Sequence, residues 1–250
     1  MYGKQLRLKR IFPGDRRLFS VPLDHSVSMG PIDGLEDTAA VVGELQRAGV
    51  DLVIVTKGAV RGLVPVLAPR TLLGIHISAS TSLNPNSNRK VLAGSAEEAM
   101  ALGADLLSVQ VNFGIPEEGD MLRDLGVAAD QCRSVGLPLL CMAYVKKAGG
   151  GTPDELRHAC RAAADLGADI VKTSYPGSLD EYRRLVRTTP APLLLGGGNR
   201  LDDDDAFLGL VRETVTAGAA GICIGRNLFQ RRPVETFAKQ VAGILHGSTK

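Results

Sequence analysis

The feature that most constrains the fold of this 250-residue chain is a repeated alternation of short apolar runs with stretches of helical periodicity. The phrases AGVD, LGAD, LGAD and AGAAG begin at positions 48, 102, 166 and 217. Each joins the end of an expected helix, through a glycine, to the next apolar run. Glycine is favoured just after a helix because it readily adopts the left-handed backbone conformation that ends one. The pattern is typical of repeated β/α units.

Eight apolar runs are predicted as strands, and their number points to one architecture. The runs span residues 18–25, 51–57, 72–77, 105–112, 138–145, 169–174, 192–196 and 221–225. Near-continuous hydrophobicity is typical of parallel strands that are buried on both faces. We therefore predict an α/β fold, a (β/α)8 TIM barrel, with a doubly wound open sheet as the alternative. A single domain is expected over residues 1–250, with 1–17 as an N-terminal lead-in.

The third unit is irregular. The Ser/Asn-rich segment 78–90, SASTSLNPNSNRK, predicts a long loop with no clear helix behind it.

Composition excludes several classes of function. The formal net charge is +2 and no run of five or six like charges occurs, which argues against nucleic-acid binding. The apolar runs are far shorter than the roughly 18 residues of a membrane helix. The four cysteines form no CxxC pair and no signal peptide precedes them, so we expect free thiols in a cytoplasmic protein. No His/Asp/Glu set has the spacing of metal ligands, and we expect neither a metal nor a cofactor.

Polar residues gather where the predicted strands end, which is where a barrel of this kind places its functional groups. They are Asp24, His25, Lys57, His76, Tyr144, Lys146 and Lys172. Two neighbouring units end in the segments LLLGGGN and ICIGRN. Their backbone N–H groups, at Gly196, Gly197, Gly198 and Gly225, together with Arg226, predict a phosphate site. The alternative is that the glycines only permit tight turns.

Lys172 lies in DIVKTSYPG, where a cationic side chain interrupts an apolar run. It is either a lysine that extends its charge to the surface or a nucleophilic amine. An amine with a lowered pKa can attack a carbonyl and form a Schiff base. Lys57 is either a second cation that lowers the pKa of Lys172 further or a surface lysine. Such chemistry needs a proton shuttle, for which Tyr144 and Asp24 have suitable side chains and positions.

The two histidines at the strand ends have alternative roles. His25 is either a general base or a residue that holds its loop by a hydrogen bond. His76 is interpreted as a satisfied barrel residue rather than a ligand.

Four segments, VPLDHSVSMGP, ADIVKTSYPG, LLLGGGN and AGAAGICIGRNLFQ, together resemble the archaeal-type (DhnA-like) class I fructose-bisphosphate aldolases and their branch of 2-amino-3,7-dideoxy-D-threo-hept-6-ulosonate synthases. The resemblance implies that Lys172 forms a Schiff base with a keto phosphate, that Tyr144 is the general acid/base, and that Asp24 is the aspartate of the first motif. It also implies that the glycine loop and Gly225 with Arg226 hold the donor phosphate. Members are usually multi-subunit rings, so a homo-oligomer such as a decamer of pentameric rings is expected.

Two departures from the family pattern concern the acceptor. Relatives continue after the tyrosine with Pro-Arg-Gly, whereas this chain has Val145-Lys146-Lys147, and a lysine lacks the planar fork of arginine. Relatives also have Asp-His-Gly where this chain has Asp24-His25-Ser26. Both departures suggest an altered aldehyde acceptor on a retained donor half-site.

The resemblance implies one specific reaction. It joins dihydroxyacetone phosphate to L-aspartate 4-semialdehyde and gives 2-amino-4,5-dihydroxy-6-oxo-7-(phosphooxy)heptanoate, as in the 3-amino-4-hydroxybenzoate pathway. The alternatives are the hept-6-ulosonate synthase, a fructose-bisphosphate aldolase, a thiolase-like relative acting on a phosphorylated dione, and a phosphosugar-binding barrel without turnover.

Overall fold

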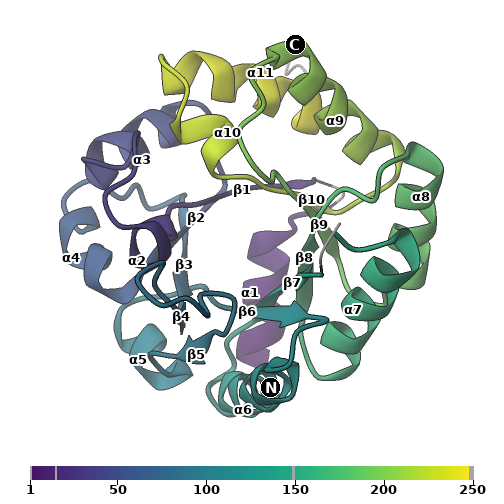
Figure 1. Ribbon diagram of the computed structural model, residues 1–250. Helices are drawn as coiled ribbons and strands as arrows, with labels where there is room; N and C mark the ends of the chain where they lie inside the picture. The colour runs from purple at the N-terminus through teal and green to yellow at the C-terminus, as the bar shows by residue number, and fades with distance from the viewer. Residues whose placement is uncertain (1, 15, 148–149, 248–250) are drawn as a thin grey trace.

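The computed structural model describes residues 2–14, 16–147 and 150–247, and eight parallel strands close into one barrel (Figure 1). Around the barrel the strands follow the order β1, β10, β9, β8, β7, β6, β3, β2. Their bounds are β1 Leu18–Pro22, β2 Leu52–Thr56, β3 Leu72–His76, β6 Leu106–Phe113, β7 Leu139–Val145, β8 Ile170–Thr173, β9 Leu193–Gly196 and β10 Gly221–Cys223. The predicted (β/α)8 barrel is confirmed.

Helices surround the barrel and connect its strands (Figure 1). The longer ones are α1 Tyr2–Ile11, α3 Thr38–Arg47, α6 Glu118–Val135, α7 Pro153–Asp165, α8 Leu179–Thr188, α9 Asp204–Thr216 and α11 Val234–His246. The shorter ones are α2 His25–Met29, η1 Lys57–Ala59, α4 Val60–Leu63, α5 Ala96–Ala101 and α10 Arg226–Phe229. Start signals explain several of them, such as α7, where Thr152 and Glu155 form a capping box.

Five predicted strands, β1, β2, β3, β8 and β10, end one to three residues earlier than expected, and at β1 and β2 the predicted polar residues lie at the helical turn that follows. β1 ends at Pro22, and Asp24 and His25 lie outside it, with Asp24 preceding the first turn of α2. β2 ends at Thr56, and Lys57 begins the short 3-10 helix η1. The side chains at these positions therefore leave the sheet and belong to the loops above it.

The irregular third unit contains a small hairpin and a helix that the sequence did not make clear. β4 (Ser78–Ala79) pairs antiparallel with β5 (Val91–Leu92), so the 78–90 segment leaves the barrel and returns to it. α5 follows, and the Ser95 hydroxyl caps it by accepting a hydrogen bond from the Glu98 N–H at 3.2 Å. The expectation of no helix here was wrong, because this short helix depends on a cap and on packing more than on length.

The N-terminal lead-in is a helix that closes one end of the barrel, where α1 is visible through the ring of strands (Figure 1). Ile11 is fully buried and packs with side chains of the barrel interior, among them Leu18 and Leu106. The Lys4 ammonium lies 2.8 Å from the carboxylate of Asp169, which precedes β8. α1 therefore covers the N-terminal ends of the strands and leaves the C-terminal ends open.

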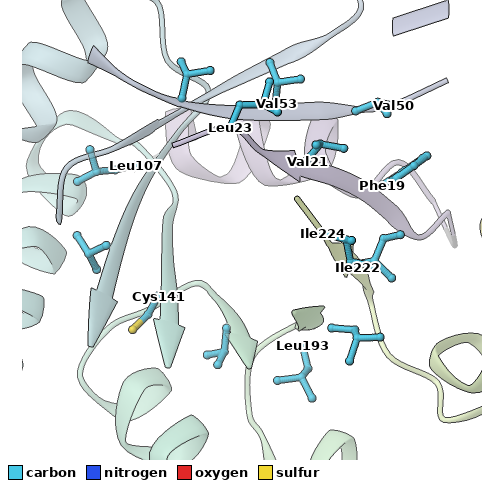
Figure 2. Close-up of a cluster of buried hydrophobic side chains, with 14 of the residues drawn as sticks. Phe19, Val21, Leu23, Val50, Val53, Leu107, Cys141, Leu193, Ile222 and Ile224 are labelled. Carbon is cyan, nitrogen blue, oxygen red and sulfur yellow. The ribbon is translucent and has the colours of Figure 1, made fainter. Parts of the chain in front are cut away.

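Apolar side chains form two cores, one inside the barrel and one between the strands and the surrounding helices. Figure 2 shows part of the second, with Phe19 and Val21 of β1, Val53 of β2 and Ile222 of β10 lying on the outer faces of their strands. Burial on both faces explains why these strands read as continuous apolar runs. The interior narrows enough that a Cβ on Gly74 would lie 2.9 Å from Ile54.

Candidate active site at the C-terminal ends of the strands

A cavity of about 400 Å³ opens at the C-terminal end of the barrel and brings the predicted polar residues together. It is lined by Pro22, Asp24, His25, Ser28, Met29, His76, Ser78, Lys90, Gln110, Met142, Tyr144, Lys146, Lys172, Ser174, Gly197, Gly198, Asn199, Cys223, Gly225 and Arg226. Every predicted site residue lines it except Gly196 and Lys57. Ligand sites in barrels occupy this end because loops from all eight units converge there.

Lys172 is the buried amine of the site, with 5% of the residue exposed. It pairs in register with Met142 on β7, and its Nζ lies 3.8 Å from the Met142 sulfur. Burial lowers the pKa of Lys172, but Cys223, Tyr144 and Asp24 around it raise the pKa above its ordinary value. The pKa of Lys172 is thus raised in the free site, contrary to the prediction of a lowered pKa, since β7, β10 and the segment after β1 place these groups around the amine.

The charged neighbour of Lys172 is Asp24. Burial raises the pKa of both Cys223 and Tyr144, so both keep their protons near neutral pH. Asp24 is different, because burial would raise its pKa while His76, His25 and Lys172 lower it below the ordinary value. The pair Asp24 and Lys172 is therefore carboxylate and ammonium before a ligand arrives.

Lys57 lies away from this pair. Its ammonium is 3.0 Å from the Glu98 carboxylate, and its side chain is 45% exposed. It does not line the cavity. The interpretation of Lys57 as a surface lysine is confirmed, and its alternative role as a second cation beside Lys172 is wrong because β2 ends one residue before it.

Tyr144 and Lys172 approach each other over Gly196. A Cβ built on Gly196 would lie 3.2 Å from the Tyr144 hydroxyl and 3.3 Å from Lys172 Cε. The same Cβ would lie 2.9 Å from the carbonyl oxygen of Thr173. Glycine at this position therefore gives the two side chains room to meet, a different place from the phosphate loop predicted for it.

Two histidines flank the Asp24 carboxylate. His25 Nδ1 lies 3.4 Å from Asp24 Oδ1, and His76 Nδ1 lies 3.6 Å from Asp24 Oδ2. Burial lowers the pKa of His25 to about 4 and also lowers that of His76, so both rings are uncharged near neutral pH. His76 Nδ1 is also 3.0 Å from the Ser108 hydroxyl, which fits its interpretation as a satisfied barrel residue.

The glycine-rich loops after β9 and β10 line the cavity next to the Asp24–His25 segment, because β10 is adjacent to β1 in the barrel. Gly198 has a φ of +63°, the left-handed region that favours glycine, and a Cβ on Gly225 would lie 2.6 Å from His25 Cε1. Arg226 lines the cavity, and its buried Nε has no hydrogen-bond partner within the described ranges. This guanidinium is available to an anion.

A family profile described as DeoC/LacD family aldolase matches residues 18–231. The chain belongs to the DeoC/LacD family of aldolases. The predicted class I aldolase family, and with it the prediction of a carbon–carbon lyase, is confirmed.

Two relatives of this aldolase are similar along almost their whole length. A 2-amino-4,5-dihydroxy-6-oxo-7-(phosphonooxy)heptanoate synthase from Streptomyces griseus is 37% identical over 99% of this chain and 92% of its own. A 2-amino-3,7-dideoxy-D-threo-hept-6-ulosonate synthase from Halobacterium salinarum is 35% identical over 98% of this chain and 92% of its own.

Among solved structures, the aldolase resembles an archaeal fructose-1,6-bisphosphate aldolase. That structure has its catalytic lysine covalently bound to the carbinolamine intermediate of the substrate. The TM-score is 0.89 and the sequence identity 26%, over 98% of this chain and all of the other. The likeness extends to the closed barrel as a whole.

Sequence reasoning placed Asn227 at the end of the eighth strand without assigning it a role, and it missed Lys90. Asn227 is fully buried on α10, and its amide donates to the carbonyls of Gly197 and Asn199 at 2.8 Å each. Its Oδ1 accepts from the Leu201 N–H at 2.8 Å, so Asn227 fixes the loop after β9 to α10. The segment ICIGRN contained this signal. Lys90 is the last residue of the polar loop 78–90, and no feature of the sequence indicated its place in the site.

Two observations concern metal ions and membranes. Within residues 2–14, 16–147 and 150–247, no group of three or more His, Cys, Asp or Glu side chains is arranged to hold a metal ion. No helix in the described part of the chain is long and apolar enough to cross a membrane.

Proposed function

We propose that this aldolase joins dihydroxyacetone phosphate to L-aspartate 4-semialdehyde through a Schiff base on Lys172, giving 2-amino-4,5-dihydroxy-6-oxo-7-(phosphooxy)heptanoate. The observation that supports it most is the buried Lys172 amine beside Tyr144 and Asp24, in a cavity that Arg226 also lines. The 37% identity to a synthase named for this product supports the choice of acceptor.

The first step is attack of the Lys172 nitrogen on the ketone carbon of the donor. The amine must first lose a proton, because Asp24 holds it as an ammonium ion in the free site, and the Asp24 carboxylate accepts that proton. A carbinolamine forms, and loss of water from it leaves an iminium, which draws electrons from the neighbouring C–H bond. The glycine loops and Arg226 hold the donor phosphate and so orient this carbon.

Tyr144 then moves the protons. Near neutral pH its hydroxyl is protonated, since burial raises its pKa, and it lies beside Lys172. It gives a proton to the leaving water and, as the phenolate, takes one from C3 of the donor to form the enamine. The enamine carbon bonds to the aldehyde carbon of the acceptor, and Tyr144 returns the proton taken from C3 to the aldehyde oxygen. Water then adds to the new iminium and releases the product ketone with the free amine.

Borohydride trapping tests the Schiff base. We expect dihydroxyacetone phosphate plus borohydride to add the mass of the reduced donor to the wild-type chain and nothing to Lys172→Met. Arg226→Met should still be trapped, but only at a higher donor concentration, because the amine is intact and the phosphate contact is lost. A wild-type chain without an adduct would contradict the proposal.

The acceptor is tested by product mass with dihydroxyacetone phosphate as donor. Aspartate semialdehyde should be converted and glyceraldehyde 3-phosphate should be a poorer substrate. Equal or better use of the phosphorylated aldehyde would instead favour a fructose-bisphosphate aldolase. The hept-6-ulosonate synthase is the second candidate, since a relative of that name is 35% identical. It predicts turnover only with a different keto phosphate donor.

We also infer that the enzyme is a cytoplasmic homo-oligomer. All four cysteines, Cys132, Cys141, Cys160 and Cys223, are buried free thiols, which fits a reducing compartment. The family resemblance supports a ring assembly. Light scattering should give a mass several times that of the 26.4 kDa chain, and a mass near 26 kDa would contradict the inference.

A further inference from the structure

Lys90 is a buried cation that the chemistry described above does not use. The residue is 9% exposed and lines the cavity. Its Nζ donates to the hydroxyls of Ser28 at 3.1 Å and Ser80 at 2.5 Å. No Asp or Glu forms an ion pair with it within the part of the chain that the structure describes. An ammonium has three N–H donors, so one remains for a ligand.

The loop that holds Lys90 is built into the barrel. The Asn112 side chain, fully buried on β6, donates to the Asn88 carbonyl at 2.6 Å. The Ser82 N–H donates to the Ser28 carbonyl at 2.9 Å, which ties the loop to α2. The Lys90 ammonium is therefore held at a fixed place over the cavity.

The strand order sets that place relative to the donor site. The loops with Gly197 and Arg226 follow the adjacent strands β9 and β10. Lys90 lies in the segment between β3 and β6, which are adjacent to each other on the opposite side of the ring. Lys172 on β8 and Tyr144 on β7 lie between the two sides. A linear molecule with its phosphate at Arg226 and its ketone at Lys172 thus extends toward Lys90.

The charges on this side favour an anion. Burial lowers the pKa of Lys90, and the nearby Lys146 lowers it further, while Asp24 raises it. Lys146 also lines the cavity, with its Nζ 5.6 Å from the centre of the Tyr144 ring. The Ser28 hydroxyl accepts from Lys90 and can donate its own hydrogen into the cavity. An ammonium and a hydroxyl side by side match the two oxygens of a carboxylate.

We propose that Lys90, assisted by Ser28 and Lys146, binds the carboxylate of the acceptor aldehyde and so selects carboxylate-bearing aldehydes. This deepens the proposed function and rests on it for the identity of the acceptor. Lys90 is a specificity residue at the far end of the substrate from Lys172.

The test compares four aldehydes with dihydroxyacetone phosphate as donor, on the wild type, Lys90→Met and the matched control Lys57→Met. Aspartate semialdehyde and succinate semialdehyde share the carboxylate at the same spacing, butanal has a methyl group in its place, and glyceraldehyde 3-phosphate carries a dianion. Loss of one charge-assisted contact should raise the KM of Lys90→Met for both carboxylates about 10- to 100-fold. Its kcat/KM for butanal should stay within about twofold, and Lys57→Met should match the wild type throughout.

Several results would overturn the proposal. Equal losses on the carboxylates and butanal would make Lys90 a structural residue. An unchanged KM for both carboxylates, or a loss confined to glyceraldehyde 3-phosphate, would assign it no role in carboxylate recognition. Borohydride trapping of the donor on Lys90→Met should be unimpaired, which shows that the variant is folded. If the wild type uses succinate semialdehyde but no aspartate semialdehyde, the proposed acceptor fails while the role of Lys90 is still tested.

Discussion

Gly196 shows how one residue sets the geometry of the chemistry. It has no side chain, and a Cβ there would lie 2.9 Å from the Thr173 carbonyl oxygen, 3.2 Å from the Tyr144 hydroxyl and 3.3 Å from Lys172 Cε. The approach of the Tyr144 and Lys172 side chains therefore depends on a residue that has no side chain of its own.

We expect Gly196→Ala to lower kcat about 100-fold while the fold is kept, because displacements of about 1 Å in a reacting pair have effects of that size. Steady-state kinetics and the thermal unfolding midpoint measure the two quantities. The control is Gly209→Ala on α9, where a Cβ would meet nothing within 4 Å, and it should leave kcat unchanged. An active Gly196→Ala enzyme would show that Tyr144 and Lys172 need no such proximity.

Asp24 should control the protonation of Lys172. Its carboxylate raises the pKa of Lys172, so Asp24→Asn lowers that pKa and leaves more neutral amine at a given pH. We expect the acid limb of the borohydride-trapping rate to move to lower pH in the variant. A limb that stays in place, or moves to higher pH, would show that another group holds the Lys172 proton.

At the scale of elements, the short helix α10 matters because it anchors a loop that belongs to another unit. Asn227 donates to the carbonyls of Gly197 and Asn199 and accepts from the N–H of Leu201. The buried Arg231 side chain also contacts this segment by donating to the Leu201 carbonyl at 2.9 Å. The loop proposed to bind the donor phosphate is therefore held in place by α10.

Removing the Asn227 anchor should weaken the binding of the donor more than the binding of the acceptor. We expect Asn227→Ala to lower the free energy of unfolding by about 1–3 kcal/mol, because buried backbone groups lose partners. The donor concentration for half-maximal trapping should rise at least fivefold, by loss of loop order. Urea unfolding and trapping at limiting dihydroxyacetone phosphate measure these effects. A destabilised variant with unchanged donor affinity would show that Asn227 contributes to stability but not to binding of the donor phosphate.

The elements that the sequence predicted well are those with a local signal. Apolar runs between helix-ending glycines were enough to predict the eight strands. The positions of Lys172, Tyr144 and Asp24 near strand ends were enough to place them on one rim of the barrel. The 78–90 segment has no such signal. Its course depends on contacts with Ser28 and Asn112, which are distant in sequence, so neither the β4–β5 hairpin nor the burial of Lys90 could be predicted. The pKa of Lys172 likewise depends on neighbours that are distant in sequence, Tyr144 on β7, Cys223 on β10 and Asp24 after β1.

At the scale of the whole molecule, the two ends of the barrel have different roles: the N-terminal end contributes to stability and the C-terminal end carries the cavity. α1 closes the N-terminal end, while the residues that line the cavity come from the C-terminal ends of the strands (Figure 1). Between them lies the interior core, in which Ile11, Leu52 and Leu140 pack together. Residues below this core can change the stability of the barrel without contacting the site.

Ile11→Ala therefore should destabilise the protein and spare its catalysis. Ile11 is 1% exposed inside the barrel, and truncating a buried isoleucine to alanine lowers the free energy of unfolding by about 2–5 kcal/mol. We expect kcat to stay within about twofold of the wild type at a temperature where the variant is folded. Leu6→Ala is the control on the same helix, since Leu6 is 61% exposed and its truncation should change neither quantity. If Ile11→Ala lowered kcat as strongly as it lowered stability, the closed end of the barrel would be coupled to the site, because the cavity would then depend on the packing of α1.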